Sequence, residues 1–249
     1  PDVQYSFDGK TWSPLLSNEN ITLENVGDKV YFKGYNPNGF DQTMSYGGPR
    51  LQFVMNGSIS ASGSIMSLID GIGETTVIPC DNCFEYLFGG CDALTQAPEL
   101  PATELTTECY SLMFSGCSSL AKAPELPATK LAEYCYGSMF LGCHSLTKAP
   151  ELPAIELTYG CYSRMFVECS SLAKAPELPA TELAEYCYVL MFTNCISLIN
   201  APELHVTELT TGCYNGMFEG CSSLVKAPEL PATKLTTGCY KRMFEGCSS

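Results

Sequence analysis

The sequence is poor in positive charge: 13 Lys and Arg side chains stand against 27 Asp and Glu side chains among 249 residues. Its formal net charge is −14 at pH 7, and its isoelectric point is near 4.5. Nucleic acids and anionic membranes attract basic surfaces, because their phosphate groups are negatively charged. We therefore expect neither a nucleic acid nor an anionic membrane as a partner.

The sequence also lacks a run of 18 apolar residues, so it predicts no membrane span in this segment. It begins at Pro1 with neither a methionine nor a charged and then apolar leader. It ends at Ser249, inside a repeated unit, where repeat arrays normally carry a polar cap. We therefore expect the chain to be a piece of a longer protein.

Histidine is scarce as well: only His144 and His205 occur, and they lie in different repeated units. A Ser-His-Asp or Cys-His arrangement cannot be assembled from them. Cys80 and Cys83 have the short spacing of a zinc half-site, but no second half follows. The sequence therefore predicts no catalytic residue, no metal site and no cofactor, and a protein that is not an enzyme.

Cysteine, by contrast, is abundant, and 14 of the 15 cysteines recur with a period of 26 residues. The first cysteine of the unit lies at positions 83, 109, 135, 161, 187, 213 and 239, and the second lies eight residues later. Such a period is typical of arrays in which each unit buries its apolar side against its neighbours. We predict an opening domain at residues 1–76 and a repeat domain at residues 77–249, with an incomplete last repeat.

The opening domain alternates short extended segments with turn signals. Asp8-Gly9 and Asn56-Gly57 are hairpin turn signals. The predicted strands are residues 3–7, 11–12, 21–23, 29–34, 51–55 and 58–60, with a last strand or a short helix at 64–69. This pattern predicts a small antiparallel β-sandwich. Its many aromatic side chains suit sugar stacking, but a domain of this size needs them to fill its core.

Within one repeated unit, apolar side chains recur every four residues. One example is the series Leu131, Cys135, Met139 and Cys143. This spacing predicts the apolar face of a short helix, with the Met and Phe columns in the core. The prolines around Glu151-Leu152 exclude a helix there and favour a short extended segment. Each unit is therefore predicted to be a strand, a turn and a helix.

The repeated frame carries a resemblance over about residues 80–249. It reads Leu-x-x-Ala-Pro-Glu-Leu-Pro, then Leu, then Cys-Tyr-x-x-Met-Phe-x-Gly-Cys-x-Ser-Leu. This is similar to the BspA-like (Treponema pallidum type) leucine-rich repeat family, whose unit has Leu-x-x-Ile-x-Ile-Pro followed by Ala-Phe-x-x-Cys-x-x-Leu. The unit here is longer and has Met-Phe in place of Ala-Phe. The opening domain resembles, less specifically, the β-sandwich domains that precede such repeats.

The resemblance implies a leucine-rich-repeat solenoid in an extracytoplasmic protein of Bacteroidetes type. It also implies a place at the cell surface, anchored in the outer membrane or secreted, and a role in surface binding and adhesion. Secretion would permit a disulfide within each unit. The position of both cysteines on the apolar face favours buried thiols instead.

Charged side chains recur in two columns beside the extended segment. A glutamate lies in each unit, and a lysine lies three residues before it in most units. The two columns form either a Lys/Glu ladder, which offsets repulsion between stacked glutamates, or a polar binding strip. His144 lies after the second cysteine, where the units vary. The candidate binding residues are Lys122, Glu125, His144, Lys148, Glu151, Lys174, Glu177, Glu203, Lys226 and Glu229.

The sequence thus predicts a mixed α and β protein, in which a small antiparallel β-sandwich precedes a leucine-rich-repeat solenoid of 26-residue strand-turn-helix units. The predicted function is a non-enzymatic binding or adhesion module that recognises a host or bacterial surface protein or a glycan. An alternative is a structural spacer, or a self-assembling subunit of a surface appendage or phage particle. A carbohydrate-active enzyme is the least supported reading.

Overall fold

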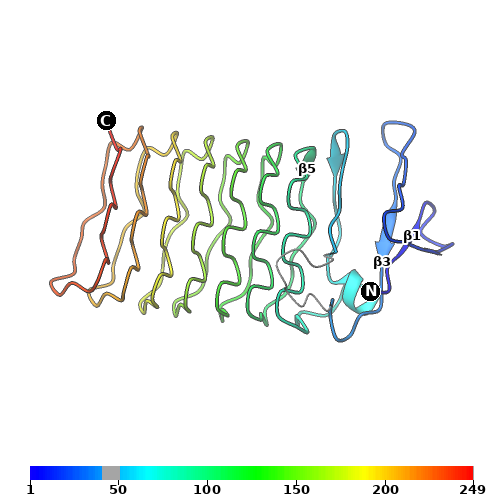
Figure 1. Cartoon of the computed structure of the whole chain (residues 1–249), viewed down its shortest axis with the longest axis horizontal. Helices are drawn as coiled ribbons and strands as arrows, with labels where there is room; N and C mark the ends of the chain where they lie inside the picture. Colours follow the sequence, from blue (N-terminus) through cyan, green and yellow to red (C-terminus); the bar gives the residue numbers. More distant parts are fainter. Residues whose placement is uncertain (41–50, 249) are drawn as a thin grey trace.

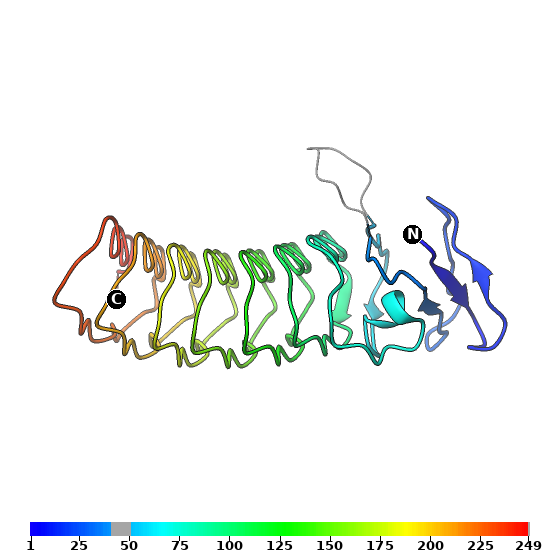
Figure 2. The same cartoon turned by 90° about the horizontal axis from the view of Figure 1, so that it is seen from below.

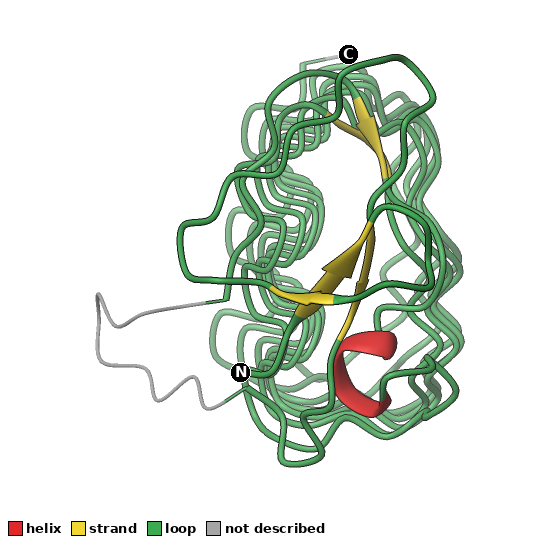
Figure 3. Cartoon of the chain, turned by 90° about the vertical axis from the view of Figure 1, so that its right-hand side faces the viewer, coloured by secondary structure: helices red, strands yellow, loops and turns green. Residues whose placement is uncertain are grey.

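The structure is a computed structural model that describes residues 1–40 and 51–248. The molecule is elongated, and each 26-residue unit forms one coil of a stack that runs along its long axis (Figure 1). Viewed along the stack, the coils follow nearly the same outline, one behind another (Figure 3). The regular elements are β1 (Gln4–Ser6), β2 (Ser13–Pro14), β3 (Tyr31–Lys33), β4 (Ile59–Ser60), α1 (Ser67–Asp70) and β5 (Leu94–Gln96).

The N-terminal end of the stack carries a three-stranded antiparallel sheet in the order β2-β1-β3. The pairing of β1 with β2 confirms the hairpin predicted at Asp8-Gly9, but its second strand lies at residues 13–14 and not at the predicted 11–12. Strand β3 lies within the strand predicted at 29–34. The Asp8 carboxylate holds the hairpin turn, because it accepts hydrogen bonds from the N–H groups of Lys10 (2.8 Å) and Thr11 (2.7 Å). These bonds to the charged form hold the pKa of Asp8 well below its usual range.

The predicted β-sandwich is wrong. Among the described residues the sheets are the N-terminal one and the two-stranded parallel pair β4-β5. Residues 21–23 and 51–55 are not strands, and β4 pairs with β5 of the first repeat instead of forming a hairpin with 51–55. The physical reason is that this segment joins the stack: the N–H of Phe53 bonds to the carbonyl of Leu87 at 2.8 Å. The division at residue 76 stays a prediction.

The short helix α1 overlaps the end of the segment 64–69, which is predicted as a strand or a short helix, and Asp70 is its last residue. Gly71 caps its C-terminus with a φ of 82° and donates to the carbonyl of Ser67. The Asp70 carboxylate then accepts from the N–H groups of Ile72 (2.8 Å) and Thr75 (2.7 Å), among others. Burial opposes ionisation of Asp70, but these backbone bonds outweigh it and lower its pKa.

The repeated units form ribbons of tight turns in place of helices. Every second backbone N–H bonds to the carbonyl three residues back, as from Met113 to Tyr110 (3.2 Å). The N–H groups between them bond to the next coil, as from Tyr110 to Cys135 (3.0 Å). Each coil is therefore tied both to itself and to its neighbour, and its backbone polar groups are satisfied without a helix.

The predicted solenoid of strand-turn-helix units is therefore wrong. The only helix among residues 1–40 and 51–248 is α1, which has four residues. Within the ribbon every fourth residue has a left-handed backbone, as at Glu108 (φ 54°), Leu112 (φ 56°) and Gly116 (φ 77°). A right-handed helix cannot continue through such residues. The four-residue apolar spacing belongs to these turns, in which two inward residues alternate with two outward ones.

The core consists of columns of identical side chains stacked from coil to coil. The Met and Phe columns are buried except for the half-buried Phe244 of the last coil, which confirms the predicted core. Equivalent rings stack nearly parallel: Phe114 and Phe140 have centroids 5.8 Å apart at 8°, and Tyr136 and Tyr162 have centroids 5.9 Å apart at 4°. Because each ring meets its own equivalent, one packing solution serves every coil.

The two cysteine columns belong to this core as thiols, which confirms the prediction of buried thiols over disulfides for the repeats. In the second column, each thiol donates to a carbonyl one coil back, as from Cys143 to Phe114 (3.2 Å) and from Cys169 to Phe140 (3.2 Å). Burial raises the pKa of Cys143 to about 12. The thiols therefore act as small apolar side chains with a weak donor.

The predicted strand at Ala-Pro-Glu-Leu-Pro is also absent from the described repeats. Isolated backbone bridges between coils lie before and after this segment, as between Lys122 and Lys148 and between Glu156 and Glu182, and in the first unit Glu99 within the segment also pairs, with Ser64. Two prolines per segment remove the donors that a continuous ladder would need. The segment therefore pairs at single residues at most and forms no continuous ladder, and leucines such as Leu126 and Leu152 are buried in the core.

Candidate functional site

All ten binding residues predicted from the sequence are exposed. The lysines lie in a real column, because Lys122 pairs with Lys148, and Lys174 and Lys226 both pair with Asn200. The glutamates recur three residues later. Among the described residues, no lysine of this column makes an ion pair with a glutamate, so the predicted Lys/Glu ladder is not formed.

The two histidine environments differ and do not converge. Nδ1 of His144 lies 3.0 Å from the carbonyl oxygen of Glu168 in the next coil. Nε2 of His205 lies 3.8 Å from a carboxylate oxygen of Glu203, and both side chains are exposed. Neither histidine has a nucleophile beside it in these contacts, so no acid–base pair of the hydrolytic type is assembled around them.

A second surface emerges from the turn ribbons, which form one tightly coiled long edge of the stack (Figure 2). We call its outward side the turn face, and it comprises residues 107–116, 133–142, 159–168, 185–194, 211–220 and 237–246. In these six ribbons the inward positions keep the same Cys-Tyr and Met-Phe pairs, whereas the outward pairs change from coil to coil. The ribbon before them, residues 81–90, has Cys83-Phe84 and Leu87-Phe88 at its inward positions. The first outward pairs are Thr107-Glu108, Glu133-Tyr134, Tyr159-Gly160, Glu185-Tyr186, Thr211-Gly212 and Thr237-Gly238.

The variation includes bulky side chains at left-handed positions. In the coil 211–220 all three such positions are glycines, Gly212, Gly216 and Gly220. At the equivalents of Gly212, Tyr134 has a φ of 50° and Tyr186 a φ of 55°. A left-handed backbone costs a non-glycine residue about 1–2 kcal/mol. The same turn forms with glycine at the equivalent position, so the turn conformation does not require a tyrosine there.

Three tyrosines of the turn face come together on three successive coils. The ring centroids of Tyr134 and Tyr159 are 5.3 Å apart at 73°, and those of Tyr159 and Tyr186 are 5.5 Å apart at 63°. All three side chains are half-buried. The edge-to-face geometry is favourable for aromatic pairs and holds each ring against its neighbour. The result is an aromatic cluster that is partly exposed to solvent.

Glycines of the following coils make room for two of these rings. A Cβ at Gly160 would come 2.3 Å from Cε1 of Tyr134, and a Cβ at Gly212 would come 2.5 Å from Cε1 of Tyr186. Each of these tyrosines therefore lies over a glycine of the next coil. The outward residue of one coil is therefore related to that of the next: a tyrosine in one coil lies over a glycine in the following coil.

The charges around the cluster are mainly acidic. Burial and the neighbouring Tyr159 hydroxyl raise the pKa of Tyr134 to about 12, Glu108 adds to the rise, and Arg164 opposes it. The phenol is therefore neutral at pH 7 and can donate a hydrogen bond. Glu133 and Glu185 lie next to Tyr134 and Tyr186 in the chain and are exposed. The cluster thus combines neutral aromatic rings with carboxylates at its rim.

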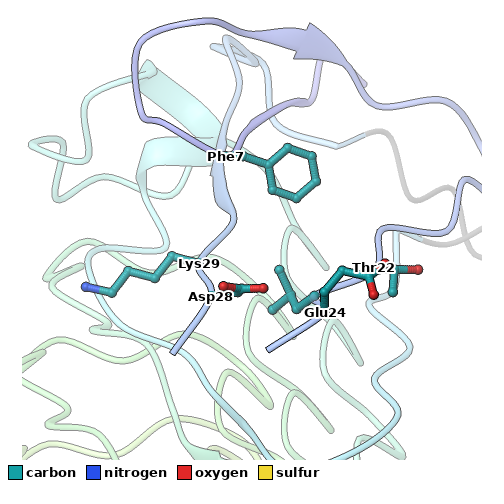
Figure 4. Close-up of a pocket in the computed structure, with 6 residues that line it drawn as sticks. Phe7, Thr22, Glu24, Asp28 and Lys29 are labelled. Atoms are coloured by element: carbon teal, nitrogen blue, oxygen red, sulfur yellow. The ribbon is translucent and has the colours of Figure 1, made fainter. Parts of the chain in front are cut away.

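A hollow near the N-terminal sheet is lined by none of the predicted binding residues. It has a volume of about 410 Å³ and is lined by Phe7, Thr22, Leu23, Glu24, Asp28 and Lys29. In Figure 4 the Lys29 ammonium points away from the other labelled side chains. The Asp28 carboxylate accepts from the N–H of Asn25 at 2.8 Å, so it serves the local turn.

Metal and membrane features can be stated for the described part of the chain. No group of three or more His, Cys, Asp and Glu side chains there is placed to hold a metal ion. Within residues 1–40 and 51–248, no helix has both the length and the apolar character to cross a membrane.

Sequence reasoning missed the turn face because it read the ribbon as a helix. A signal for it was present: the pattern Cys-Tyr-x-x-Met-Phe-x-x-Cys places two apolar residues, then two variable ones, with a period of four instead of 3.6. The position after the second cysteine, such as His144, varies as well, but the x-x pairs vary more and lie on the turn face.

Comparison with known proteins adds no relative from which a site could be transferred. No family model, no curated protein and no solved structure matches the chain. The resemblance to the BspA-like family therefore stays a prediction, which rests on the repeated frame alone.

Proposed function

We propose that the chain is a non-enzymatic binding or adhesion module that acts outside the cytoplasm and recognises a protein or glycan through its repeat surface. One observation carries this proposal: variation between coils concentrates at the outward pairs of the turn face, while the inward pairs stay the same. Variable residues on a rigid frame are the usual arrangement of a binding surface. The kinship to BspA-like surface proteins, also a proposal, agrees with it.

The frame suits this role because it is ordered before any partner arrives. Hydrogen bonds link each ribbon to the next, as from Leu112 to Gly137 (2.9 Å) and from Phe114 to Met139 (3.0 Å). A surface that is already ordered loses less conformational entropy on binding than a flexible loop does. The outward side chains are therefore presented at fixed positions along the stack.

The proposal is tested by measuring binding of the chain to purified host matrix proteins, bacterial surface proteins and a glycan array. A turn-face variant carries Thr-Gly, the pair at 211–212, at positions 133–134, 159–160 and 185–186. A second variant, Lys148→Asn with Glu177→Gln, alters the predicted polar strip on another part of the repeat surface. Saturable binding that either variant weakens supports a repeat-surface module. Absence of saturable binding across all three panels contradicts it.

A second candidate is a structural spacer or an assembly subunit. The observation that favours it is the uniform stacking of the core rings, whose centroids are 5.8 Å apart both for Tyr188 with Tyr214 and for Phe114 with Phe140. A stack with the same contacts throughout changes length without changing its frame. Light scattering as a function of concentration tests it: regular oligomers without any bound ligand favour this candidate, and a monomer excludes self-assembly.

A further inference from the structure

We propose that the turn face binds a positively charged protein segment at one place, the Tyr/Glu cluster of Glu133, Tyr134, Tyr159, Glu185 and Tyr186. Lysine and arginine side chains of the partner would lie against the tyrosine rings and pair with the two carboxylates. This inference rests on the proposed function and specifies the partner of the same face.

The five residues lie at two adjacent positions of three successive coils. The backbone joins them directly: the N–H of Tyr134 bonds to the carbonyl of Tyr159 (3.0 Å), and the N–H of Gly160 bonds to the carbonyl of Glu185 (3.1 Å). One column therefore reads Glu133, Tyr159, Glu185, with a tyrosine between two carboxylates. The adjacent column places Tyr134 and Tyr186 on either side of Gly160. The cluster is nearly symmetric about Tyr159.

The cluster is not a by-product of the frame. Tyr134 and Tyr186 occupy left-handed positions where Gly212 and Gly238 serve other coils. Threonine occupies the position of Tyr159 at both 211 and 237. Other coils thus have a smaller residue, glycine or threonine, at the position of each tyrosine. Tyr134 and Tyr186 are nevertheless present, although a left-handed backbone is unfavourable for a tyrosine. Bulky aromatic side chains kept at such a cost on a surface indicate a role in contact.

Charge complementarity selects a cationic partner. On the turn face of these three coils Glu133, Glu168 and Glu185 stand against a single basic residue, Arg164. Elsewhere on this face Arg242 pairs with Glu219 (2.7 Å) and Glu245 (2.6 Å). Neither Glu133 nor Glu185 makes an ion pair within the described chain. Acidic groups around neutral rings attract cations and repel polyanions.

Ring geometry argues against a glycan as the occupant. Neighbouring rings are inclined at 73° and 63°, so the three tyrosines share no flat platform on which successive sugar rings could stack. A cation needs the face of only one ring. Tyrosine and a few complementary charges are also the side chains that dominate the energetics of protein interfaces. A basic protein segment therefore fits this cluster better than an oligosaccharide.

The test uses the whole chain and three defined probes at about 0.15 M salt, where long-range charge effects are screened. The probes are a decapeptide of Lys and Arg spaced by Gly and Ser, its Glu counterpart, and cellopentaose. Binding is measured by calorimetry for wild type and for the Tyr swap, Tyr134→Gly with Tyr159→Thr and Tyr186→Gly. Each replacement already occurs at that position in another coil. The Tyr swap keeps the net charge, so nonspecific attraction is unchanged.

We expect the basic decapeptide to bind wild type and to lose about tenfold in affinity in the Tyr swap, as expected for the loss of two or more cation–π contacts. Glu133→Gln with Glu185→Gln should also weaken binding, whereas the matched pair Glu151→Gln with Glu177→Gln should not. Equal affinity of wild type and Tyr swap overturns the inference, and so does no binding of the decapeptide. Cellopentaose binding that the Tyr swap abolishes overturns it in favour of a glycan site.

Thermal unfolding shows separately whether the Tyr swap folds; if it does not, the single variant Tyr159→Thr takes its place. The two proposals fail differently. A partner from the panels that binds wild type and the Tyr swap equally contradicts the Tyr/Glu cluster and leaves the binding module intact. A chain that binds no partner in any panel contradicts the binding module.

Discussion

The ring of Tyr134 lies over Gly160 of the next coil, in the space that a Cβ at position 160 would occupy. That Cβ would come 2.3 Å from Cε1 of the ring, and Gly160 has a φ of 58°. The same relationship recurs between Tyr186 and Gly212. A tyrosine at this position of one coil is therefore accompanied by a glycine in the next, which couples the outward residues of neighbouring coils.

This relationship predicts the effect of Gly160→Ala. The left-handed backbone costs alanine about 1 kcal/mol, and displacement of the Tyr134 ring adds about 1–2 kcal/mol. The matched control is Gly238→Ala, because Gly238 also has a positive φ (66°) but has no atom within 4 Å of its ideal Cβ. The free energy of unfolding in urea should fall by about 2–3 kcal/mol for Gly160→Ala and by about 1 kcal/mol for the control. Equal losses would show that the ring moves aside freely.

The stacked tyrosines of the core lead to a second prediction. The hydroxyls of Tyr110 and Tyr136 are buried and have no hydrogen-bond partner in the described chain. An unsatisfied buried hydroxyl costs about 1–3 kcal/mol. Tyr136→Phe removes only that hydroxyl and keeps the ring stacked on Tyr110 and Tyr162. We expect the variant to be more stable by about 1 kcal/mol in urea unfolding. A loss of stability would instead reveal a partner for the hydroxyl, such as an enclosed water.

The sequence was sufficient for the repeat and its core, because both follow from which side chains recur. The 26-residue spacing of residues such as Met113 and Phe114 predicts columns in contact, and the structure confirms that these columns are buried. The backbone between them could not be inferred in the same way. Over nine residues, a period of four and the helical period of 3.6 nearly coincide. The left-handed residues are also hidden, since Leu112 and Tyr134 give no glycine signal.

The candidate site was harder to predict than the core for a related physical reason. If residues 133–142 formed a helix, no fixed pair of residues would face outward in every unit. Tyr134 and Tyr159 occupy neighbouring but different positions of the repeat, so a helix gives no reason to expect a contact between them. The turn ribbon brings neighbouring coils into direct hydrogen bonding and places these rings 5.3 Å apart. The exposed Lys and Glu columns were easier to predict, because identical residues at the same position of each repeat align in a stack whatever the backbone conformation.

Acid sensitivity is a third prediction, and it concerns Asp8 and Asp70. Both carboxylates accept backbone hydrogen bonds that lower their pKa in the folded chain. A lowered folded-state pKa contributes stability that is present above the unfolded pKa, near 3.9, and is lost as pH falls through the folded value. The melting temperature of wild type should therefore decline below about pH 4. Asp70→Asn should melt lower at pH 7 and show a flatter decline.

Asp92→Asn serves as the control for this pH series, because Asp92 is exposed and its carboxylate accepts no hydrogen bond in the described chain. It should melt as wild type does at pH 7 and follow the wild-type decline. A curve for Asp70→Asn that runs parallel to wild type from pH 7 to pH 3 would remove Asp70 as a source of acid sensitivity.

The last prediction concerns the cysteine columns, whose chemistry is suppressed by the same packing that makes them part of the core. The thiol of Cys143 is buried and donates to the carbonyl of Phe114, and burial raises its pKa to about 12. Since the thiolate is the reactive form, such a thiol should react extremely slowly at pH 8 in the folded chain. Cys80 and Cys247 are only half-buried, unlike the other cysteines, and should react first. Mass spectrometry after timed alkylation, without reductant, follows each site. Rapid labelling of Cys143 in the folded chain, or thiols that stay blocked after unfolding, would contradict a core of buried thiols.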